Sequence, residues 1–563
     1  MGLFFLDYGA GNVQSLANSL RKLGYEFQWI RTAEDFDKAT SLIFPGVGSF
    51  GSAVTALESK GLLEPLHKYI ASGRPYFGIC IGMQVLFESS TESPSVKGLG
   101  LIPAKIDLFD NADKTVPHMG WNSIDLLDSA DKSDEGLLES SHYYFVHSYR
   151  ASYDPDGNPV AAHWVHSTTQ YGQEVFMASV RKANVFGTQF HPEKSGDAGL
   201  RIISAWLSES ESARSSAPPT PRIPRPPKPR DGLTKRIVAC MDVRSNDEGD
   251  LVVTKGDQYD VREKAPAAPG TIQAQAEGAV RNLGKPVALA ARYYAAGADE
   301  LCLMNITSFR HSPLRDQPML AVVRAAAEEV FVPLTIGGGI KDTVDPDGTK
   351  RSALEVAGLY FRAGADKVSI ASEAVYAVER MRARPSQDGI GEGDGTSAIE
   401  TIAHAYGRQA VVVSIDPKRV YVDLSYDGPY RDEVIRGSPG TEDEAKAWWY
   451  QCTASGGREV RPLSVVQLAR GVEKLGAGEI LLNSIDRDGT GKGFDIDLIQ
   501  LVRKNVRIPM VASSGAGSAA HFVEVFQKTD VEAALAAGIF HRGEVGIGEV
   551  KDVLSSAGVN ARR

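Results

Sequence analysis

One pattern governs the chain from residue 233 onward: a short apolar segment is followed by a stretch with helical spacing, again and again. Eight apolar segments begin near Arg236, Glu300, Val332, Asp366, Ala410, Glu479, Ile508 and Ala533. Each has the length of a buried strand, and polar or glycine-rich sequence follows it. Eight such units are typical of a closed barrel of parallel strands covered by helices. We therefore predict a (β/α)₈ (TIM) barrel over residues 233–563.

This region also repeats within itself. Asp242, at the end of the first expected strand, is matched by Asp416, 174 residues later. The sequence Gly-Ala-Asp-Glu that ends at Glu300 is matched by Gly-Ala-Gly-Glu that ends at Glu479, 179 residues later. The near-constant offset predicts two half-barrels of four units each.

A proline-rich segment at residues 208–232 separates this region from residues 1–207. Prolines lack the amide donor and favour an extended chain, so the segment predicts a linker; a ligand for a signalling domain is the alternative. Before it, apolar strands at Leu3–Leu6, Ser41–Phe44 and Tyr76–Ile79 and helical spacing from Val13 to Leu23 predict an open α/β sheet.

Composition excludes several classes of function. The net charge of −10 argues against nucleic acid or an anionic membrane as the main partner, and no run of 18 apolar residues predicts a membrane span. The four cysteines are too dispersed for a disulfide framework or a zinc cluster, and Gly9 and Gly11 lack the third glycine of a dinucleotide fingerprint. We expect a cytoplasmic protein with no metal and no cofactor.

The first region contains a sharp turn built around a cysteine. Gly78-Ile79-Cys80-Ile81-Gly82 follows an expected strand and precedes a helical run predicted over Met83–Ser89. A strand-to-helix elbow exposes its central side chain near a helix N-terminus, which favours the thiolate; a packed core cysteine is the alternative. His191 and Glu193 could then accept the thiol proton and orient the imidazole, which completes a Cys-His-acid triad.

These two segments, GICIGMQ around Cys80 and QFHPEKS around His191, resemble the class I glutamine amidotransferases. The resemblance implies hydrolysis of glutamine through a γ-glutamyl thioester, with release of ammonia. It also implies that the strand containing Gly48 faces the oxyanion and that Gln84 contacts the substrate glutamine. The sequences around His118 and His147 resemble the histidine-biosynthesis branch, where we expect both histidines to be structural or interface residues.

In a barrel, the chemistry lies at the carboxyl ends of the strands. Glycine-rich turns at Gly337–Gly339 and Ser513–Gly517 lie half a barrel apart and predict two phosphate sites, although either could be only a tight turn. Asp242 and Asp416 end equivalent strands of opposite halves, which predicts an acid/base pair; the alternative is that each caps its own loop. Lys255 is expected to cover a phosphate or the pocket.

The segments RIVACMDV, LTIGGGIKD, GADKVSI, SIDPKRV, GEILLNSIDRDGT and SSGAG resemble the cyclase of the imidazole glycerol phosphate synthases, over nearly the whole barrel. The resemblance implies the bis-phosphorylated substrate PRFAR, a ribulosyl-formimino aminoimidazole carboxamide ribotide, which ammonia converts into imidazole glycerol phosphate and AICAR. Asp242 and Asp416 match the acid/base pair. The fused arrangement implies a fungal- or plant-type enzyme that needs no partner subunit, and we expect a monomer.

The two resemblances together imply these substrate-binding residues: Gly48, Gln84, Lys255, Gly338, Gly339, Ala371, Ser372, Asn483, Asp488, Gly489, Ser514, Gly515, Gly517 and Gly538. Two positions depart from the bacterial pattern, since Ala371 stands where Asn is common and Asn305 where Asp is common. The segment from Tyr421 to Arg461 is longer than in bacteria and is either a lid or an elaboration.

Charged residues stand where four of the strands begin, at Arg236, Glu300, Lys367 and Glu479. A neutral ring of two cations and two anions at the barrel floor could be purely structural. In the family that the barrel resembles, this ring is the gate through which ammonia enters. We therefore expect the elbow of Cys80 to face the barrel floor.

Three other interpretations remain open. The chain could be a glutaminase joined to the vitamin B6 synthase barrel, which uses lysine chemistry that this sequence fits poorly. It could be an isomerase with the same half-barrel repeat, which would not need Cys80. It could also be a non-catalytic scaffold that retains an inactive glutaminase.

Overall fold

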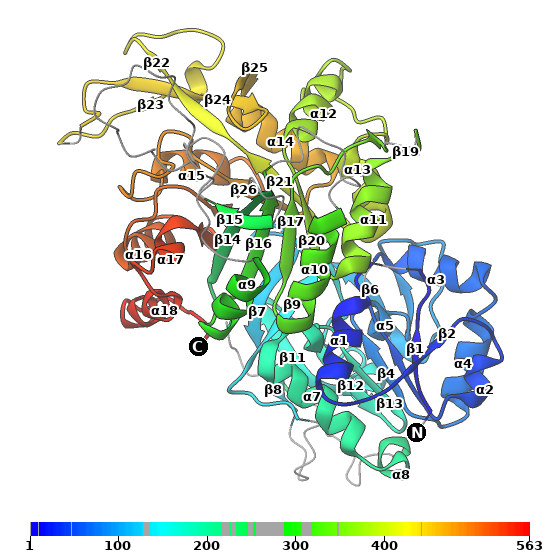
Figure 1. Ribbon diagram of the computed structural model, residues 1–563. Helices are drawn as coiled ribbons and strands as arrows, with labels where there is room; N and C mark the ends of the chain where they lie inside the picture. The colour runs from blue at the N-terminus through cyan, green and yellow to red at the C-terminus, as the bar shows by residue number, and fades with distance from the viewer. Residues whose placement is uncertain are drawn as a thin grey trace.

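The computed structural model describes residues 2–9, 11–46, 48–127, 136–216, 225–226, 232–245, 251–254, 286–306, 317–345, 348–440 and 442–563. Figure 1 shows the N-terminal unit, in blue and cyan, packed against a barrel that runs from green to red. Lys255, expected near the substrate, lies outside the described residues.

The N-terminal unit is built on an eight-stranded sheet with the order β2-β1-β3-β4-β13-β12-β11-β8. Its strands are β1 (Leu3–Leu6), β2 (Gln28–Ile30), β3 (Ser41–Phe44), β4 (Tyr76–Ile79), β8 (Asp125–Leu126), β11 (Val165–Tyr171), β12 (Glu174–Lys182) and β13 (Val185–Thr188). The first five in this order are parallel and the last three pairings are antiparallel. The prediction of an open α/β sheet is confirmed, and β1, β3 and β4 have the predicted bounds.

The helices of this unit are α1 (Gln14–Lys22), α2 (Asp35–Lys38), α3 (Phe50–Ser59), α4 (Leu63–Ala71), α5 (Ile81–Gln84), α6 (Pro159–Ala162) and α7 (Gly196–Ser208). The helix α8 (Glu211–Ser215) follows in the proline-rich segment. Further along this segment, Arg225 forms an ion pair with Asp125 at 2.9 Å, which ties the segment to the sheet.

The helical run predicted over Met83–Ser89 is wrong. The helix α5 ends at Gln84 after one turn, and Phe87–Ser90 forms the strand β5, which pairs in parallel with β6 (Ile102–Leu108). Phe87 and Ile102 are paired and fully buried. A pairing partner 15 residues away therefore overrides the local helical spacing. Two more small pairings complete the unit: β10 (Tyr149–Arg150) with β6, and β7 (His118–Ser123) with β9 (His142–His147).

The barrel strands follow the order β14-β16-β17-β20-β21-β26-β27-β28, and the pairing of β14 with β28 closes the sheet. Their bounds are Arg236–Ser245, Glu300–Asn305, Leu334–Gly337, Lys367–Ile370, Val411–Ile415, Glu479–Leu482, Met510–Ala512 and Ala533–Ala536. The eight-stranded parallel barrel is confirmed, with each strand starting within two residues of its predicted position.

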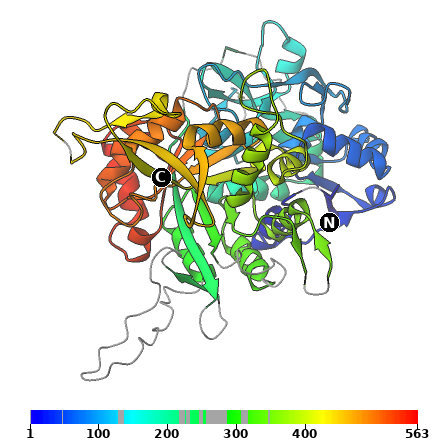
Figure 2. The same ribbon diagram turned by 90° about the horizontal axis from the view of Figure 1, so that it is seen from above.

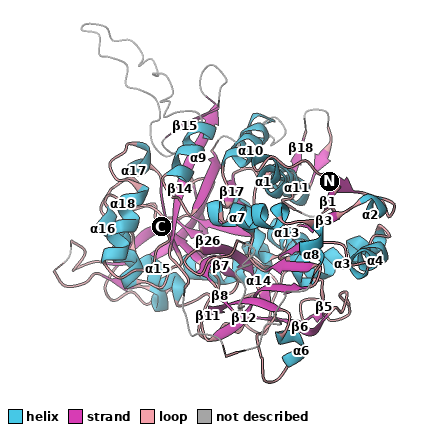
Figure 3. Cartoon of the chain, turned by 90° about the horizontal axis from the view of Figure 1, so that it is seen from below, coloured by secondary structure: helices cyan, strands magenta, loops and turns pink. Residues whose placement is uncertain are grey.

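The barrel helices are α9 (Pro286–Ala295), α10 (Gln317–Glu329), α11 (Ala353–Ala363), α12 (Ser372–Arg382), α13 (Ala398–Tyr406), α14 (Val465–Leu475), α15 (Ile496–Arg503), α16 (Ala519–Lys528), α17 (Gly538–His541) and α18 (Ile547–Ser556). Figure 3 shows helices around the central strands. Capping boxes begin α11 and α14 at Ser352 and Ser464, and left-handed glycines end them.

An antiparallel sheet interrupts the barrel after β21. It consists of β22 (Pro417–Val422), β23 (Ile435–Arg436), β24 (Ala447–Ala454) and β25 (Glu459–Ser464). Stacking of Tyr430 on Trp449, with ring centroids 4.1 Å apart, and of Arg419 over Trp448 stabilises it. Figure 2 shows this sheet, in yellow, on the side of the barrel away from the N-terminal unit. Shorter hairpins involve β15 (Leu251–Thr254), which pairs with β14, and β18 (Thr343–Val344) with β19 (Lys350–Arg351).

The N-terminal unit covers the end of the barrel where the strands begin. Trp121 Nε1 donates to the carbonyl of Asp299, the residue before β16, at 3.0 Å. Thr115 donates to Glu532, the residue before β28, at 2.8 Å. Lys194 forms an ion pair with Asp366, the residue before β20, at 2.7 Å. The carboxyl ends of the strands, where the barrel pocket lies, are therefore at the opposite end from the N-terminal unit.

Candidate active sites

Cys80 sits at a strained turn between β4 and α5. Its φ of +50° is rare for a residue other than glycine. The turn is tight enough to demand glycines around it: a Cβ on Gly46 would lie 1.9 Å from the carbonyl oxygen of Ile79, and one on Gly78 would lie 2.3 Å from that of Gly82. Strain of this kind, held by packing, is typical of a nucleophile elbow.

The structure brings Cys80, His191 and Glu193 together. His191 Nδ1 lies 2.7 Å from Glu193 Oε1, and the imidazole also interacts electrostatically with the Cys80 side chain. Burial lowers the pKa of His191, but the charges of Glu193 and Cys80 outweigh that effect and hold this pKa well above its ordinary value. A raised pKa makes the imidazole a stronger base, suited to accept the thiol proton of Cys80.

Gln189 is a member of this site that the sequence reasoning missed. Its Nε2 donates to Cys80 Sγ at 3.4 Å, and its Oε1 accepts from Gln84 Nε2 at 2.9 Å. Gln84 also donates to the carbonyl of Tyr149, and it is not among the residues that line the cavity at Cys80. Only its place two residues before His191 could have singled out Gln189.

His118 and His147 lie in the paired strands β7 and β9. Their rings are joined at 3.2 Å between Nδ1 and Nε2. Burial lowers the pKa of both, to about 3 for His147, so both are uncharged near neutral pH. This supports the expectation that they are structural.

A cavity at Cys80 spans the boundary between the two units. It is lined by Gly46, Gly48, Cys80, Tyr144, Val146, His191 and Lys194 from the N-terminal unit and by Asp366, Lys367, Tyr406, Gln409 and Ala410 from the barrel. The central residue of the expected oxyanion strand, Val47, lies outside the described residues. The barrel residues of this cavity come from positions far from the triad in sequence, and only Lys367 among them was predicted.

The four charged strand beginnings form one buried ring. Lys367 Nζ lies 2.6 Å from both Glu300 and Glu479, and Arg236 lies 2.7 Å from Glu300 and also pairs with Glu479. Burial raises the pKa of Glu479, but Arg236 and Lys367 outweigh it and hold that pKa below its ordinary value. All four side chains are almost fully buried. Because Lys367 also lines the cavity at Cys80, one member of the ring borders that cavity.

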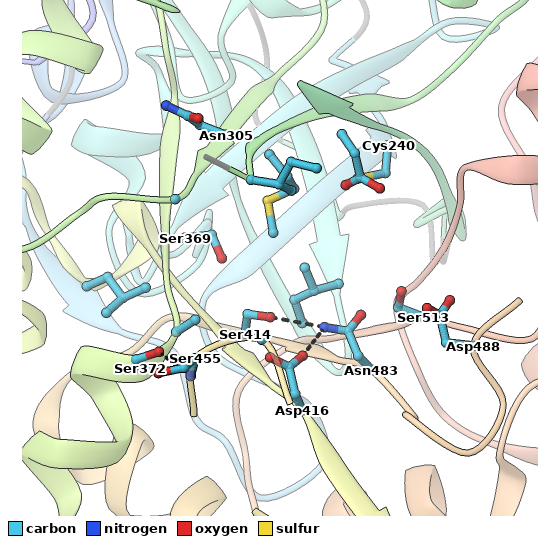
Figure 4. A pocket seen from close by; sticks show the side chains of 18 of the residues that line it. Cys240, Asn305, Ser369, Ser372, Ser414, Asp416, Ser455, Asn483, Asp488 and Ser513 are labelled. Carbon is cyan, nitrogen blue, oxygen red and sulfur yellow. Dashed lines mark hydrogen bonds between the residues drawn. The ribbon is translucent and has the colours of Figure 1, made fainter. Parts of the chain in front are cut away.

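At the other end of the barrel lies a pocket of about 360 Å³. Asp242, from β14, and Asp416, directly after β21, both line it. Burial and the nearby Asp488 raise the pKa of Asp416, and the amide of Asn483 opposes them. Figure 4 shows this arrangement, with the Nδ2 of Asn483 donating to Asp416 at 2.6 Å.

Seven of the expected substrate-binding residues line this pocket: Gly338, Gly339, Ala371, Ser372, Asn483, Asp488 and Ser514. Gly489, Gly515, Gly517 and Gly538 are not among its lining residues. Gly515 and Gly517 instead pack against the backbone of Gly493 and Gly491, where a Cβ would clash. They shape the turn rather than line the pocket.

The hairpin sheet contributes to the pocket. Ser455, Gly456 and Arg458, from the turn between β24 and β25, line it together with Ser372. Ser455 has a φ of +54°, and its amide donates to Ser372 Oγ at 2.9 Å. The sequence predicts either a lid or an elaboration for this segment, and the tip of the β24–β25 turn forms part of the pocket wall.

The described residues contain neither a candidate metal site nor a helix that could span a membrane. No group of three or more His, Cys, Asp or Glu side chains in them is arranged to hold a metal ion. Among their helices, none combines the length and the apolar character that crossing a membrane requires.

Comparisons with known proteins agree with this architecture. Residues 4–207 match the family described as glutamine amidotransferase class-I, and residues 236–387 and 393–546 match the family described as histidine biosynthesis protein. The chain is 52% identical to the imidazole glycerol phosphate synthase hisHF of Emericella nidulans, over 99% of this chain and 98% of that one. It is 51% identical to the synthase of Schizosaccharomyces pombe, over 98% of each chain. It is also 51% identical to the chloroplastic one of Arabidopsis thaliana, over 99% of this chain and 89% of that one.

The chain belongs to the bifunctional imidazole glycerol phosphate synthases.

Imidazole glycerol phosphate synthases of this fused type are enzymes of histidine biosynthesis that combine a glutamine amidotransferase with a cyclase. Glutamine hydrolysis and ammonia transfer fit the two family matches. These matches decide against the vitamin B6 synthase barrel, the isomerase without a glutaminase and the non-catalytic scaffold.

Proposed function

We propose that Cys80, His191 and Glu193 hydrolyse glutamine in the cavity between the two units. His191 takes the proton of the Cys80 thiol, and the thiolate attacks the carboxamide carbon of glutamine. His191 then gives the proton to the leaving nitrogen, so that ammonia departs and a thioester remains. Water attacks the thioester, releases glutamate and restores the thiol. The tight approach of Gly46 to the elbow and the position of Gly48 in the cavity support the neighbouring backbone as the oxyanion site.

We propose that the ammonia enters the barrel through the ring of Arg236, Glu300, Lys367 and Glu479. This proposal rests on Lys367, which both lines the cavity at Cys80 and forms ion pairs within the ring. Beyond the ring, the barrel interior is lined by a small apolar cluster: Val238, Cys240, Cys302, Val412, Leu481, Val511, Ala533 and Leu535. An apolar path keeps ammonia away from bulk water, where it would be protonated and lose its nucleophilic electron pair.

We propose that the barrel pocket binds PRFAR, with one phosphate near Gly338 and Ser372 and the other near Ser514. At the first end, Lys341 and Arg458 also line the pocket and the helix α12 begins, a setting that favours an anion. Ammonia attacks the substrate, Asp242 and Asp416 exchange the protons, and the products are imidazole glycerol phosphate and AICAR. Two carboxyl groups in one pocket, one with a raised pKa, suit paired acid and base roles.

We further propose the division into a glutaminase at residues 1–207, a linker at 208–232 and a cyclase at 233–563, supported by the gap between the two family matches. We propose a monomer, because both catalytic units and their contact surface lie in one chain, and light scattering on the purified protein tests it. We propose a cytoplasmic location, in keeping with the fungal relatives, whose names carry no organelle term, unlike the chloroplastic plant relative. Imaging of a fluorescent fusion tests it.

The turnover of PRFAR by Cys80→Ala tests the main proposal, measured once with glutamine and once with an ammonium salt at high pH. We expect activity to be lost with glutamine and kept with ammonia. Loss with both donors would mean that the barrel assignment is wrong or that Cys80 supports the fold, and a melting curve separates these two. Undiminished activity with glutamine would reject the triad.

A further inference from the structure

Asn483, directly after β26, is expected from the sequence to contact the substrate, yet its side chain is turned toward the strand beside it. Its Nδ2 donates to Asp416 Oδ1 at 2.6 Å and to Ser414 Oγ at 3.0 Å, as Figure 4 shows. Its backbone amide donates to the carbonyl of Ile415 at 3.0 Å, which fixes the residue against β21. The side-chain amide of Asn483 is therefore directed at the carboxyl of Asp416 and at the hydroxyl of Ser414.

The backbone of Asp416 is held separately. Thr453 Oγ1, on β24, donates to the carbonyl of Asp416 at 2.6 Å. The orientation of the carboxyl group, by contrast, depends on Asn483 and Ser414, the groups that hydrogen-bond it among the described residues. Since Ser414 is itself an acceptor for Asn483, the three side chains form one small network.

We propose that Asn483 is a positioning residue that fixes the carboxyl of Asp416 in the orientation in which it exchanges a proton with the substrate. This inference rests on the acid/base role proposed above for Asp416. A short hydrogen bond from an amide stabilises the ionised carboxylate without competing for its proton, since the amide cannot accept it. Asn483 therefore controls both the geometry of Asp416 and the ease with which it loses its proton.

The charged groups around Asp416 make the effect of Asn483 on the pKa of this carboxyl measurable. The titratable groups that line the same pocket are Cys240, Asp242, Lys341, Glu373, Arg458 and Asp488, and Cys452 faces Asp416 from β24. Burial and the charge of Asp488 both raise the pKa of Asp416, whereas Asn483 lowers it. Removing the amide leaves only Ser414 to oppose the raising effects, so we expect the pKa of Asp416 to rise further.

The test compares Asn483→Leu, which has nearly the same size and no donor, with Asn483→Thr, which keeps a hydrogen donor on a shorter side chain. PRFAR turnover with ammonia is measured across pH in the full-length protein, so that the glutaminase does not enter. For Asn483→Leu we expect kcat to fall about 10- to 100-fold while KM changes little, because a hydrogen bond to a charged group is lost. The limb of the pH profile that reports Asp416 should move to higher pH, and Asn483→Thr should recover part of both effects.

Asn505→Leu is the matched control, because it makes the same substitution two residues after α15, where the side chain of Asn505 donates to the carbonyl of Leu501. Asn483→Leu with an unchanged kcat and pH profile would overturn the inference, and so would a rise in KM alone, which would make Asn483 a substrate contact. If Asn483→Leu fails to fold, Asn483→Thr decides by the same two readouts. Activity retained by Asp416→Asn would instead reject the acid/base role proposed above. That outcome is distinguishable, because it is observed in the Asp416 variant and not in the Asn483 variants.

Discussion

Asp299 combines a buried carboxylate that is paired within the barrel with a backbone contact to the glutaminase. Its carboxylate accepts from Lys551 at 2.6 Å, from Arg562 at 2.8 Å and from the backbone amide of Ile237 at 2.8 Å. Its own carbonyl accepts from Trp121 of the glutaminase, and the guanidinium of Arg562 stacks over the Trp121 ring at 4.0 Å. Burial raises the pKa of Asp299, but the two cations and the amide outweigh it and hold the pKa below its ordinary value.

Asp299→Asn should therefore destabilise the protein in a pH-dependent way. A carboxyl whose pKa is lower in the folded state than in the unfolded chain adds stability above the unfolded pKa of about 3.9, and this stability is lost as the pH falls through the folded value. We expect the free energy of unfolding of the variant to be lower by about 3 kcal/mol at pH 7, because two buried cations lose their partner. The difference should shrink below about pH 4.

Denaturant titrations of both proteins at pH 7 and at acidic pH provide the measurement. Asp37→Asn, at an exposed position of α2, is the matched control and should change little at either pH. Equal stability of Asp299→Asn and the parent protein at pH 7 would contradict the account of this cluster.

At the scale of elements, the barrel strands begin with charges where apolar residues would be simpler to bury. Two cations and two anions face one another there. Lys367 lies 2.6 Å from both Glu300 and Glu479, and Arg236 lies 2.7 Å from Glu300. Thr335, on β17, donates to Glu300 at 2.6 Å, and Lys367 also reaches the sulfur of Met119 at 3.6 Å. A ring that needed only stability could be replaced by apolar side chains of the same volume, so its charges fit the proposed gate better than a purely structural role.

Lys367→Met should uncouple the two reactions. The variant removes one cation from the ring but keeps a long side chain. Arg236 still pairs with both glutamates, so we expect a folded barrel of reduced stability. We expect PRFAR turnover with ammonia to be largely retained, and more than one glutamate to form for each imidazole glycerol phosphate when glutamine is the donor. Measuring both products in one reaction gives this ratio.

Lys504→Met, at an exposed position after α15, is the control and should leave the ratio at one. Arg236→Ala is a second variant that opens the ring from β14. Full coupling in both ring variants would exclude the gate.

At the scale of the whole molecule, Asp366 is the point where the glutaminase and the barrel meet beside the triad. Its carboxylate pairs with Lys194 at 2.7 Å and accepts from Asn12 at 2.8 Å and from the amide of Leu334 at 2.8 Å. Lys194 belongs to the 3-10 turn Pro192–Lys194, which directly follows His191 and contains Glu193. The ion pair between Lys194 and Asp366 therefore links the barrel to the segment that contains His191 and Glu193.

Asp366→Asn should weaken this connection, at a residue that also lines the cavity at Cys80, while leaving the barrel pocket intact. Asparagine keeps the size of the side chain but removes the charge opposite Lys194, a buried cation. We expect PRFAR turnover with ammonia to stay within about twofold, and turnover with glutamine to fall about tenfold, which corresponds to about 1.4 kcal/mol of lost transition-state stabilisation. Steady-state assays with the two nitrogen donors measure both rates.

Asp342→Asn is the matched control. The carboxylate of Asp342 accepts from the backbone amide of Ala353, and both residues belong to the barrel. Equal losses with both nitrogen donors would show that Asp366 supports the barrel rather than the contact between the units.

The sequence by itself determined the eight barrel strands, three strands of the glutaminase sheet and the closed barrel, and it singled out the residues that we propose for the triad and the charged ring. These features are local or periodic. A buried strand is recognised from a few consecutive apolar residues, and a half-barrel repeat is recognised from its constant spacing. The tertiary structure alone decided that Phe87–Ser90 is a strand, that Gln189 reaches Cys80, that Asn483 turns to Asp416 and that the turn at Ser455 enters the pocket. It also decided that Lys367 lines the cavity at Cys80. Each of these depends on a partner that lies elsewhere in the chain, and such contacts are set by how whole elements pack, which no local stretch of sequence records.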